Sequence, residues 1–305
     1  MPAQDDSAVT TIDRVPLKSA EIGEGLTIRR ALPTRQRRMV GAWCFLDHLG
    51  PVAFGAGEGM HVGAHPHTCL QTFTWMIQGQ ILHRDSLGSQ QVIRPGQVNL
   101  MTAGRGIVHT EDSLPAEPLL HAAQLWIALP PEHADTAPAF EHYPDLPTWS
   151  DGGVDFTLLA GHHGGHTAPT RLYSPLLGLD LNSEAGATAT LALNPAFEYG
   201  LLPLQGRLRI GSETLSTDEF AYLGQGHSRL VLELEAGSRV LLLGGAPFEH
   251  PIVMWWNFVD FSREAIAQSQ KEWEANAPRF GRVAGDEGRR LLAPALSWKA
   301  ATGLA

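Results

Sequence analysis

Cysteine is scarce in this chain, and its scarcity limits the class of protein. The 305 residues contain two cysteines, Cys44 and Cys69. Small secreted domains that depend on disulfides need several cysteine pairs, so no disulfide framework is predicted. A reducing compartment is compatible with this composition.

Basic residues and long apolar runs are also few. The chain has 22 Lys and Arg against 32 Asp and Glu, which gives a formal net charge of -10. Direct DNA or RNA binding needs a basic face and is therefore not expected, although contact with a DNA-bound protein is compatible. No apolar run is long enough to cross a bilayer, and residues 1–16 lack a basic segment followed by an apolar core. We expect a soluble cytoplasmic protein.

What the chain does contain is many short strand-like segments separated by turns. Its 32 glycines and 21 prolines punctuate runs such as LQTFTWMIQG, HAAQLWIALP and ATATLALN. Closely spaced strands of this kind predict an all-β fold of antiparallel barrels or sandwiches. One helix is predicted within residues 262–280, with Ser262 as its N-cap.

A weak internal repeat predicts two similar domains. The segment 77–81 (IQGQI) resembles 204–208 (LQGRL), and a Pro-rich, acidic segment between the halves has the composition of a bridge. We place the domains at 1–138 and 139–305. Counting back from the shared Gln-Gly, residues 192–194 (ALN) occupy the place that HPH, residues 65–67, has in the first half. A metal site would therefore belong to the first domain.

Two histidine-containing pairs carry the chemistry of the first half. His65 and His67 are separated by one residue, as are His109 and Glu111. Side chains two apart on a strand point to the same face, so two such strands in a small barrel can converge on one point. An HxH pair alone is more often an ordinary strand feature. Together the pairs favour a metal site, and three imidazoles with one carboxylate suit Fe, Mn, Ni, Cu or Zn.

The chain also resembles the pirin family of the cupin superfamily. The resemblance lies in HPHTCLQTFTWMIQG, HRDSLG and PGQVNLMTAGRGIVHTE, and it extends to LLLGGAPFEHPIVMWWNFVDFSREAI near the C-terminus. It implies a bicupin of two antiparallel, jelly-roll-like barrels with a short C-terminal helix. It also implies one metal in the N-terminal barrel, with iron as the principal expectation and Zn, Mn, Ni or Cu as alternatives. By match to the family motif the ligands are His65, His67, His109 and Glu111.

One segment departs from the family pattern. Pirins usually have HPHRGFE where this chain has HPHTCLQ, so the family glutamate is replaced by Gln71. We expect Gln71 to act as a neutral hydrogen-bond partner beside the metal ligands. Cys69 could replace the lost carboxylate as a soft ligand, but a small apolar core residue is the stronger expectation. The departure puts the family's typical activity in question.

A third group of histidines, His162, His163 and His166, lies in a Gly-rich segment without a carboxylate. We expect a solvated loop there rather than a second metal site.

The resemblance implies two competing functions. Some pirins resemble quercetin 2,3-dioxygenases, which open a flavonol ring with O₂ and release carbon monoxide. Glu111 would then be ligand and general base. The residues expected to surround the ligands or line an aromatic pocket are Gln71, Cys69, Phe73, Trp75, Met101, Gln124 and Trp126. Core packing is the stronger expectation for at least half of the large apolar ones.

The alternative is a regulatory protein. Pirins are also implicated as iron-dependent, redox-sensing partners of transcription factors or metabolic enzymes, and an acidic surface is compatible with protein partners. A metal with a mainly structural role is a third possibility. The expected partners of the enzyme are a small phenolic substrate and O₂, without direct nucleic-acid or membrane binding.

Overall fold

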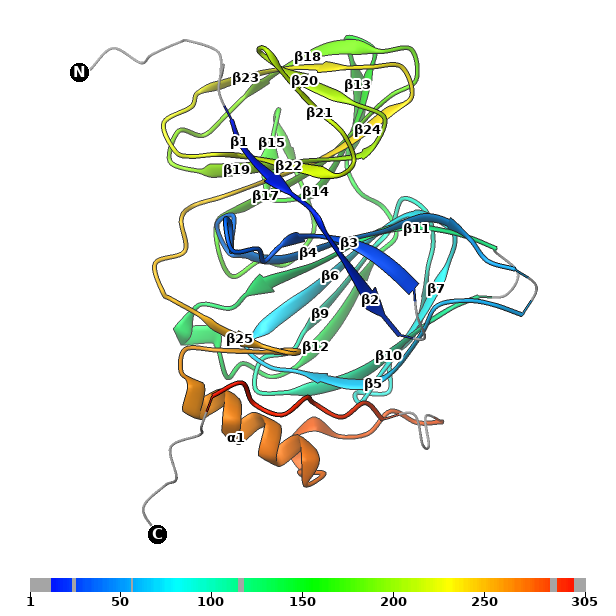
Figure 1. Cartoon of the computed structure of the whole chain (residues 1–305), viewed down its shortest axis with the longest axis vertical. Coiled ribbons are helices and arrows are strands. Elements are labelled where there is room, and N and C mark those ends of the chain that lie inside the picture. Colours follow the sequence, from blue (N-terminus) through cyan, green and yellow to red (C-terminus); the bar gives the residue numbers. More distant parts are fainter. Residues whose placement is uncertain (1–11, 24–25, 56, 115–117, 286–289, 299–305) are drawn as a thin grey trace. The chain divides into compact units, whose positions relative to one another are not determined.

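The computed structural model describes residues 12–23, 26–55, 57–114, 118–285 and 290–298. The first eleven residues, which the expectation of no secretory segment largely concerns, lie outside this part. Antiparallel β-sheets dominate the described chain, which has the bicupin fold (Figure 1). No helix in the described ranges is long and apolar enough to cross a bilayer.

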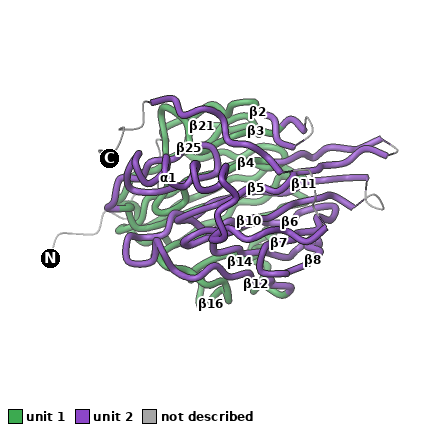
Figure 2. Tube along the Cα trace, turned by 90° about the horizontal axis from the view of Figure 1, so that it is seen from below, with its two compact units in different colours: residues 1–20, 28–48, 145–248 green, residues 21–27, 49–144, 249–305 purple. Residues whose placement is uncertain are grey.

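The chain forms two compact units that exchange segments at both ends (Figure 2). Unit 1 comprises residues 1–20, 28–48 and 145–248, and unit 2 comprises residues 21–27, 49–144 and 249–305. The domain boundary expected at residue 138 stays a prediction, and residues 139–144 belong to unit 2 in this division. Three strands run from one unit into the other: β2 (Lys18–Ile22), β3 (Leu26–Leu32) and β4 (Trp43–Ala53).

Unit 1 is built from a seven-stranded and a four-stranded sheet. The larger has the order β1-β22-β19-β24-β17-β14-β13, the smaller has the order β18-β23-β20-β21, and β15 and β16 form a separate hairpin. The strands are β1 (Asp13–Pro16), β13 (Thr148–Asp151), β14 (Val154–Ala160), β15 (His162–His163), β16 (His166–Thr167), β17 (Leu176–Ser183), β18 (Ala187–Ala192), β19 (Glu198–Gln205), β20 (Leu208–Ile210), β21 (Glu213–Leu215), β22 (Glu219–Leu223), β23 (Arg229–Leu234) and β24 (Ser238–Gly245).

Unit 2 repeats this plan. Its four-stranded sheet has the order β5-β10-β7-β8, and its larger sheet contains the run β12-β9-β6-β11. The elements are β5 (His61–His67), β6 (Leu70–Gln78), β7 (Ile81–Asp85), β8 (Gln90–Ile93), β9 (Val98–Thr102), β10 (Ile107–Ser113), β11 (Leu119–Ala128), η1 (Pro131–His133), β12 (Ala139–Tyr143), β25 (Val253–Trp255), β26 (Phe258–Asp260), α1 (Arg263–Glu274) and η2 (Pro278–Phe280).

Alternation of side chains explains the core of unit 1. Buried residues alternate with more exposed ones in β18 and β23. They are Ala189 and Leu191 in β18, and Leu230, Leu232 and Leu234 in β23. Facing partners such as Leu191 and Leu230 lie on the same side of the sheet. They join a continuous apolar cluster that includes Leu201, Leu232 and Leu242. Burial of this inner face therefore holds the unit together.

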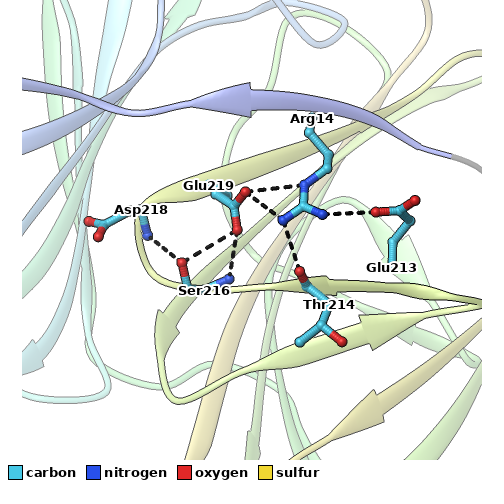
Figure 3. Close-up of polar contacts among 6 residues, drawn as sticks. All are labelled: Arg14, Glu213, Thr214, Ser216, Asp218 and Glu219. Atoms are coloured by element: carbon cyan, nitrogen blue, oxygen red, sulfur yellow. Dashed lines mark hydrogen bonds and ion pairs between the residues drawn. The ribbon is translucent and has the colours of Figure 1, made fainter.

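Ion pairs join the edge strand of unit 1 to its neighbours, in addition to backbone pairing and the buried side chain of Val15. On β1, the guanidinium of Arg14 donates to the carboxylates of Glu213 at 2.8 Å and Glu219 at 2.5 Å, and to the carbonyl of Thr214 at 3.0 Å (Figure 3). These carboxylates lie on β21 and β22, so one arginine joins strands of both sheets.

The predicted C-terminal helix is confirmed and covers the strands that carry the histidine pairs. The Ser262 hydroxyl accepts a hydrogen bond from the amide of Ala265 at 3.1 Å, as an N-cap does. The helix ends at Glu274, earlier than residue 280, and Pro278 begins η2. Ile266 and Trp273 of the helix belong to the same apolar cluster as Ala64 and Val108, which lie on β5 and β10. The opposite face of these strands is thus left for the histidines.

The HPHTCLQ segment is not one continuous strand. β5 ends at His67 and β6 begins at Leu70, with Cys69 between them in the left-handed region at φ 55°. The chain passes from the four-stranded sheet into the larger one at this corner. The alternation that relates His65 to His67 therefore does not extend to Cys69 and Gln71.

Candidate metal centre

Three neighbouring strands each contribute a pair of polar residues with one spacer. The pairs are His65 with His67 on β5, His109 with Glu111 on β10, and His83 with Asp85 on β7. Register places His109 opposite both His65 and Asp85, and Glu111 opposite His83. Facing residues share a side of the sheet, so all three pairs project from one face.

The three predicted histidine ligands converge. The potential ligand atoms of His65, His67 and His109 all lie within 4.8 Å of one another. Their rings are 4.3 to 5.0 Å apart between centroids, and each histidine is at most 6% exposed. Sequence spacing thus identified three side chains that the structure brings to one point.

Backbone contacts orient two of these rings. The Nδ1 of His65 lies 2.8 Å from the carbonyl oxygen of Gly63, and the Nδ1 of His67 lies 3.1 Å from that of Asn257. A carbonyl only accepts, so each Nδ1 carries the proton and each Nε2 keeps its lone pair. Burial, together with repulsion from His65, holds the pKa of His67 well below its ordinary value. The ring of His67 is therefore neutral and able to bind a cation.

The arrangement of His67 and His109 fits a cation between them. Their Nε2 atoms lie 3.1 Å apart. Burial and the neighbouring histidines also hold the pKa of His109 well below its ordinary value, so both rings are neutral at pH 7. One of these nitrogens can donate a hydrogen bond to the other, and where both are unprotonated their lone pairs can bind the same transition metal.

Glu111 lies beside this cluster rather than within it. Its carboxylate groups with His83 and His109 in a second set of ligand atoms within 4.8 Å, and this set does not include His65 or His67. Burial and the adjacent Asp112 raise the pKa of Glu111 to about 7. A buried carboxyl without a neighbouring positive charge behaves in this way, and a bound cation would favour its charged form.

His83 and Asp85 were not predicted as site residues. The sequence signal was present, because His83-Arg84-Asp85 repeats the one-residue spacing of the other two pairs. His83 is 3% and Asp85 is 2% exposed, and His83 lies next to His109, with ring centroids 5.1 Å apart.

The larger sheet supplies a wall opposite the histidines. Trp126 packs edge-on to His67 with centroids 5.1 Å apart, and Phe140 stacks on His83 at 4.3 Å. Met101 pairs in register with Phe140, and Gln124 lies two residues from Trp126, so all four lie on one face. Trp126, Met101 and Gln124 thus lie on the face of the larger sheet that packs against the histidines, and their role in a pocket stays a prediction.

Three other predicted pocket residues lie on the opposite face of that sheet. Register pairs Trp126 with Thr72, so Gln71, Phe73 and Trp75 alternate away from it. The amide of Gln71 donates to the hydroxyl of Thr102 at 3.0 Å on that far face. We therefore correct the expected role of Gln71 beside the ligands. Phe73 and Trp75 are fully buried and act in packing.

The geometry of Cys69 favours the core role. Its side chain is buried, and the thiol donates weakly to the carbonyl of Leu129 at 3.9 Å. Burial raises the pKa of Cys69 to about 12, so the sulfur stays protonated at neutral pH. A protonated thiol is a poor metal ligand.

The third predicted group, His162, His163 and His166, does not form the loop that we expected. His162 and His163 form β15, which pairs with β16 in a short hairpin. Trp149 stacks on His166 with centroids 4.4 Å apart and planes 6° from parallel. The Nδ1 of His162 instead lies 2.8 Å from the hydroxyl oxygen of Thr167. Among the described residues, both groups of three potential metal ligands lie in unit 2.

The fold and the histidine cluster define a bicupin with a candidate metal-binding site in unit 2. Family models agree: Pirin matches residues 25–127, and the Pirin C-terminal cupin domain matches residues 178–281. The chain belongs to the pirin family.

Curated relatives extend this result along the chain. A Pseudomonas aeruginosa protein named "Putative quercetin 2,3-dioxygenase" is 62% identical over 288 residues, which cover 94% of this chain and 91% of that protein. A pirin-like protein of Caulobacter vibrioides is 38% identical and covers 81% and 88% respectively.

A solved structure supports the same fold. The crystal structure of quercetin 2,3-dioxygenase from Acinetobacter baumannii matches with a TM-score of 0.92 at 50% identity, covering 93% of this chain and 95% of that one. The bicupin expectation is therefore confirmed.

Proposed function

We propose that this protein is a metal-dependent dioxygenase of the quercetin 2,3-dioxygenase type. Its substrates would be a flavonol or a related phenol and O₂. Support comes from the names of the P. aeruginosa relative and of the A. baumannii structure. The observation that carries the proposal is the set of buried imidazoles whose Nε2 atoms converge beside Glu111.

His65, His67, His109 and Glu111 would hold the ion. The imidazoles of His67 and His109 are neutral, and backbone carbonyls orient those of His65 and His67. Four protein ligands would leave room for ligands from solution on an octahedral ion. Iron is our first choice, with Zn, Mn, Ni and Cu as alternatives. When bound, the metal supplies Lewis acidity and a template that brings the phenol and O₂ together.

Glu111 would act as the general base for the substrate hydroxyl. A bound cation would favour the charged carboxylate of Glu111, and a carboxylate beside the substrate can act as a general base. Its carboxylate can accept the proton of the substrate hydroxyl and hold it within the buried site. Trp126 and Met101 provide apolar surface on the opposite sheet, which suits a flat aromatic ring and excludes water.

The test is turnover by protein that has been stripped of metal and reloaded separately with Fe, Mn, Ni, Cu and Zn. Flavonol loss, O₂ consumption and CO release are measured together, with metal content determined for every sample. We expect matched loss of flavonol and O₂ with at least one ion. Glu111→Gln at equal occupancy should turn over about a hundred- to ten-thousandfold more slowly, with a smaller change in substrate binding.

Two outcomes limit the proposal. Parent-like turnover by fully loaded Glu111→Gln would leave Glu111 as a ligand without a base role. Absence of turnover with all five ions, across a panel of flavonols and simpler phenols, would reject the enzyme. Capture of a protein partner by one iron oxidation state alone would then support the regulatory function.

A further inference from the structure

A continuous hydrogen-bonded chain leads away from His109 into β7. The Nδ1 of His109 lies 3.3 Å from the Nδ1 of His83, and the Nε2 of His83 lies 3.1 Å from a carboxylate oxygen of Asp85. Both ring nitrogens of His83 are thus engaged. Phe140 stacks on the His83 ring at an interplanar angle of 15°, which fixes the plane of the ring.

The turn after β7 fixes Asp85. Its second carboxylate oxygen accepts hydrogen bonds from the amides of Leu87 at 2.9 Å and Ser89 at 3.0 Å. Burial alone would raise the pKa of Asp85, but hydrogen bonds from His83 and Ser89 outweigh it and hold the pKa below its ordinary value. The carboxylate is therefore charged at neutral pH and can only accept.

Because Asp85 can only accept, it determines which ring nitrogen carries the proton in His83 and, through it, in His109. Asp85 takes a hydrogen bond from the Nε2–H of His83, and in the neutral form of the His83 imidazole this leaves a lone pair on Nδ1. That lone pair accepts from the Nδ1–H of His109, which leaves the Nε2 of His109 unprotonated. This is the nitrogen that faces His67 at 3.1 Å.

We propose that Asp85 and His83 are positioning residues that set the tautomer of His109 and aim its Nε2 at the metal. Partners of this kind fix the ring orientation and raise the basicity of a metal-bound histidine. Here an imidazole transmits the effect of the carboxylate. The inference rests on the proposed metal centre but not on any catalytic activity.

Two substitutions at Asp85 separate this role from a merely structural one. In Asp85→Asn, the carbonyl oxygen stays with the two turn amides, so the NH₂ group faces His83. His83 must then accept at Nε2 and donate from Nδ1, which forces the proton of His109 onto its metal-facing Nε2. Asp85→Ala breaks the turn contacts but leaves both tautomers open. A structural role predicts more damage from alanine, whereas the tautomer role predicts more damage from asparagine.

The measurement is the dissociation constant of Co²⁺ by chelator competition, together with the visible spectrum of the saturated protein. We expect Asp85→Asn to weaken binding about a hundredfold and Asp85→Ala about tenfold, with a shifted Co²⁺ spectrum in both. His83→Gln, whose carbonyl can still accept from His109, should bind more tightly than His83→Phe. Asp112→Asn removes a nearby carboxylate that is not part of the hydrogen-bonded series from Asp85 to His109, and it should weaken Co²⁺ binding less.

Circular dichroism and thermal unfolding of the metal-free proteins check the fold of each variant. Parent-like Co²⁺ affinity in both Asp85→Asn and His83→Phe would overturn the inference, as would more damage from alanine than from asparagine at Asp85. Complete loss of Co²⁺ in His83→Gln would identify His83 as a ligand and also reject the positioning role. If the variants show the expected changes in Co²⁺ binding but the protein never turns over a phenol, the proposed enzyme is rejected and this inference stands.

Discussion

The two units place different residues at matching positions of the same four-stranded sheet. By strand order, β5, β10 and β7 of unit 2 correspond to β18, β23 and β20 of unit 1. The inward-facing residues of unit 2 include histidines and carboxylates beside Ile81 and Ile107. Those of unit 1 are Ala189, Leu191, Leu230, Leu232, Leu234, Leu208 and Ile210.

This comparison separates the fold from the chemistry. Unit 1 fills the interior of its sheets with aliphatic side chains and uses ion pairs, such as those of Arg14, at an exposed edge. Unit 2 has imidazoles close together at strand positions where unit 1 buries aliphatic side chains. The shared architecture therefore does not require a metal, and a metal site is an addition to it. The stabilities of the two units should respond differently to substitution, pH and metal.

The largest effect is expected from removing a histidine of the cluster. His67→Ala deletes one of three converging imidazoles, so we expect near-complete loss of bound metal, measured by elemental analysis after loading and gel filtration. The parent should hold one ion per chain. His142→Ala, which removes a histidine outside the cluster, is the control. Two ions per parent chain, or a full complement in His67→Ala, would contradict the division between the units.

A substitution that creates a cavity in unit 1 should lower the stability of the protein without changing its metal content. Leu232 is fully buried in the aliphatic interior. Leu232→Ala should lower the free energy of unfolding by about 2–5 kcal/mol, because it loses apolar burial and leaves a cavity. Metal content per folded chain should not change. Urea unfolding combined with metal analysis makes the measurement, and simultaneous loss of metal would show that the two interiors are not independent.

The pH dependence of the metal-free protein should have two opposing contributions from unit 2. The pKa values of His67 and His109 are lowered by burial, so their contribution to stability is lost as pH falls below about 6.5. The pKa of Glu111 is raised to about 7, so its contribution is present below about pH 4.5 and is lost as pH rises towards 7.

Urea midpoints between pH 5 and 7 separate these contributions. Glu111→Gln removes the group that favours low pH, and its stability should fall more steeply than that of the parent as pH decreases. His67→Gln should make the same fall shallower. Identical slopes in all three metal-free proteins would contradict the assigned pKa directions.

The smallest effect is expected at Gln71. Because its amide bonds to Thr102 on the face away from Trp126, Gln71→Ala should cost about 1 kcal/mol of stability through the lost hydrogen bond. The Co²⁺ dissociation constant should stay within a few-fold of the parent value. A tenfold or greater weakening of metal binding would restore the role beside the ligands that the sequence suggested.

Local sequence determined a large part of this protein. The alternation of side chains in a strand was enough to pair His65 with His67 and His109 with Glu111, because that geometry depends only on the extended backbone. Turn residues and short apolar runs predicted an all-β protein. Ser262 predicted the start of the helix, because an N-cap is a contact between near neighbours.

Tertiary structure decided the features that depend on distant segments. The left-handed corner at Cys69 moved Gln71 into another sheet, and no local pattern in HPHTCLQ marked that bend. The lateral order of the strands placed β7 beside β10 and so brought His83 and Asp85 to His109. Strand order arises from pairings between remote parts of the chain. Sequence could therefore identify chemical pairs on single strands, but only the folded sheets could show which pairs meet.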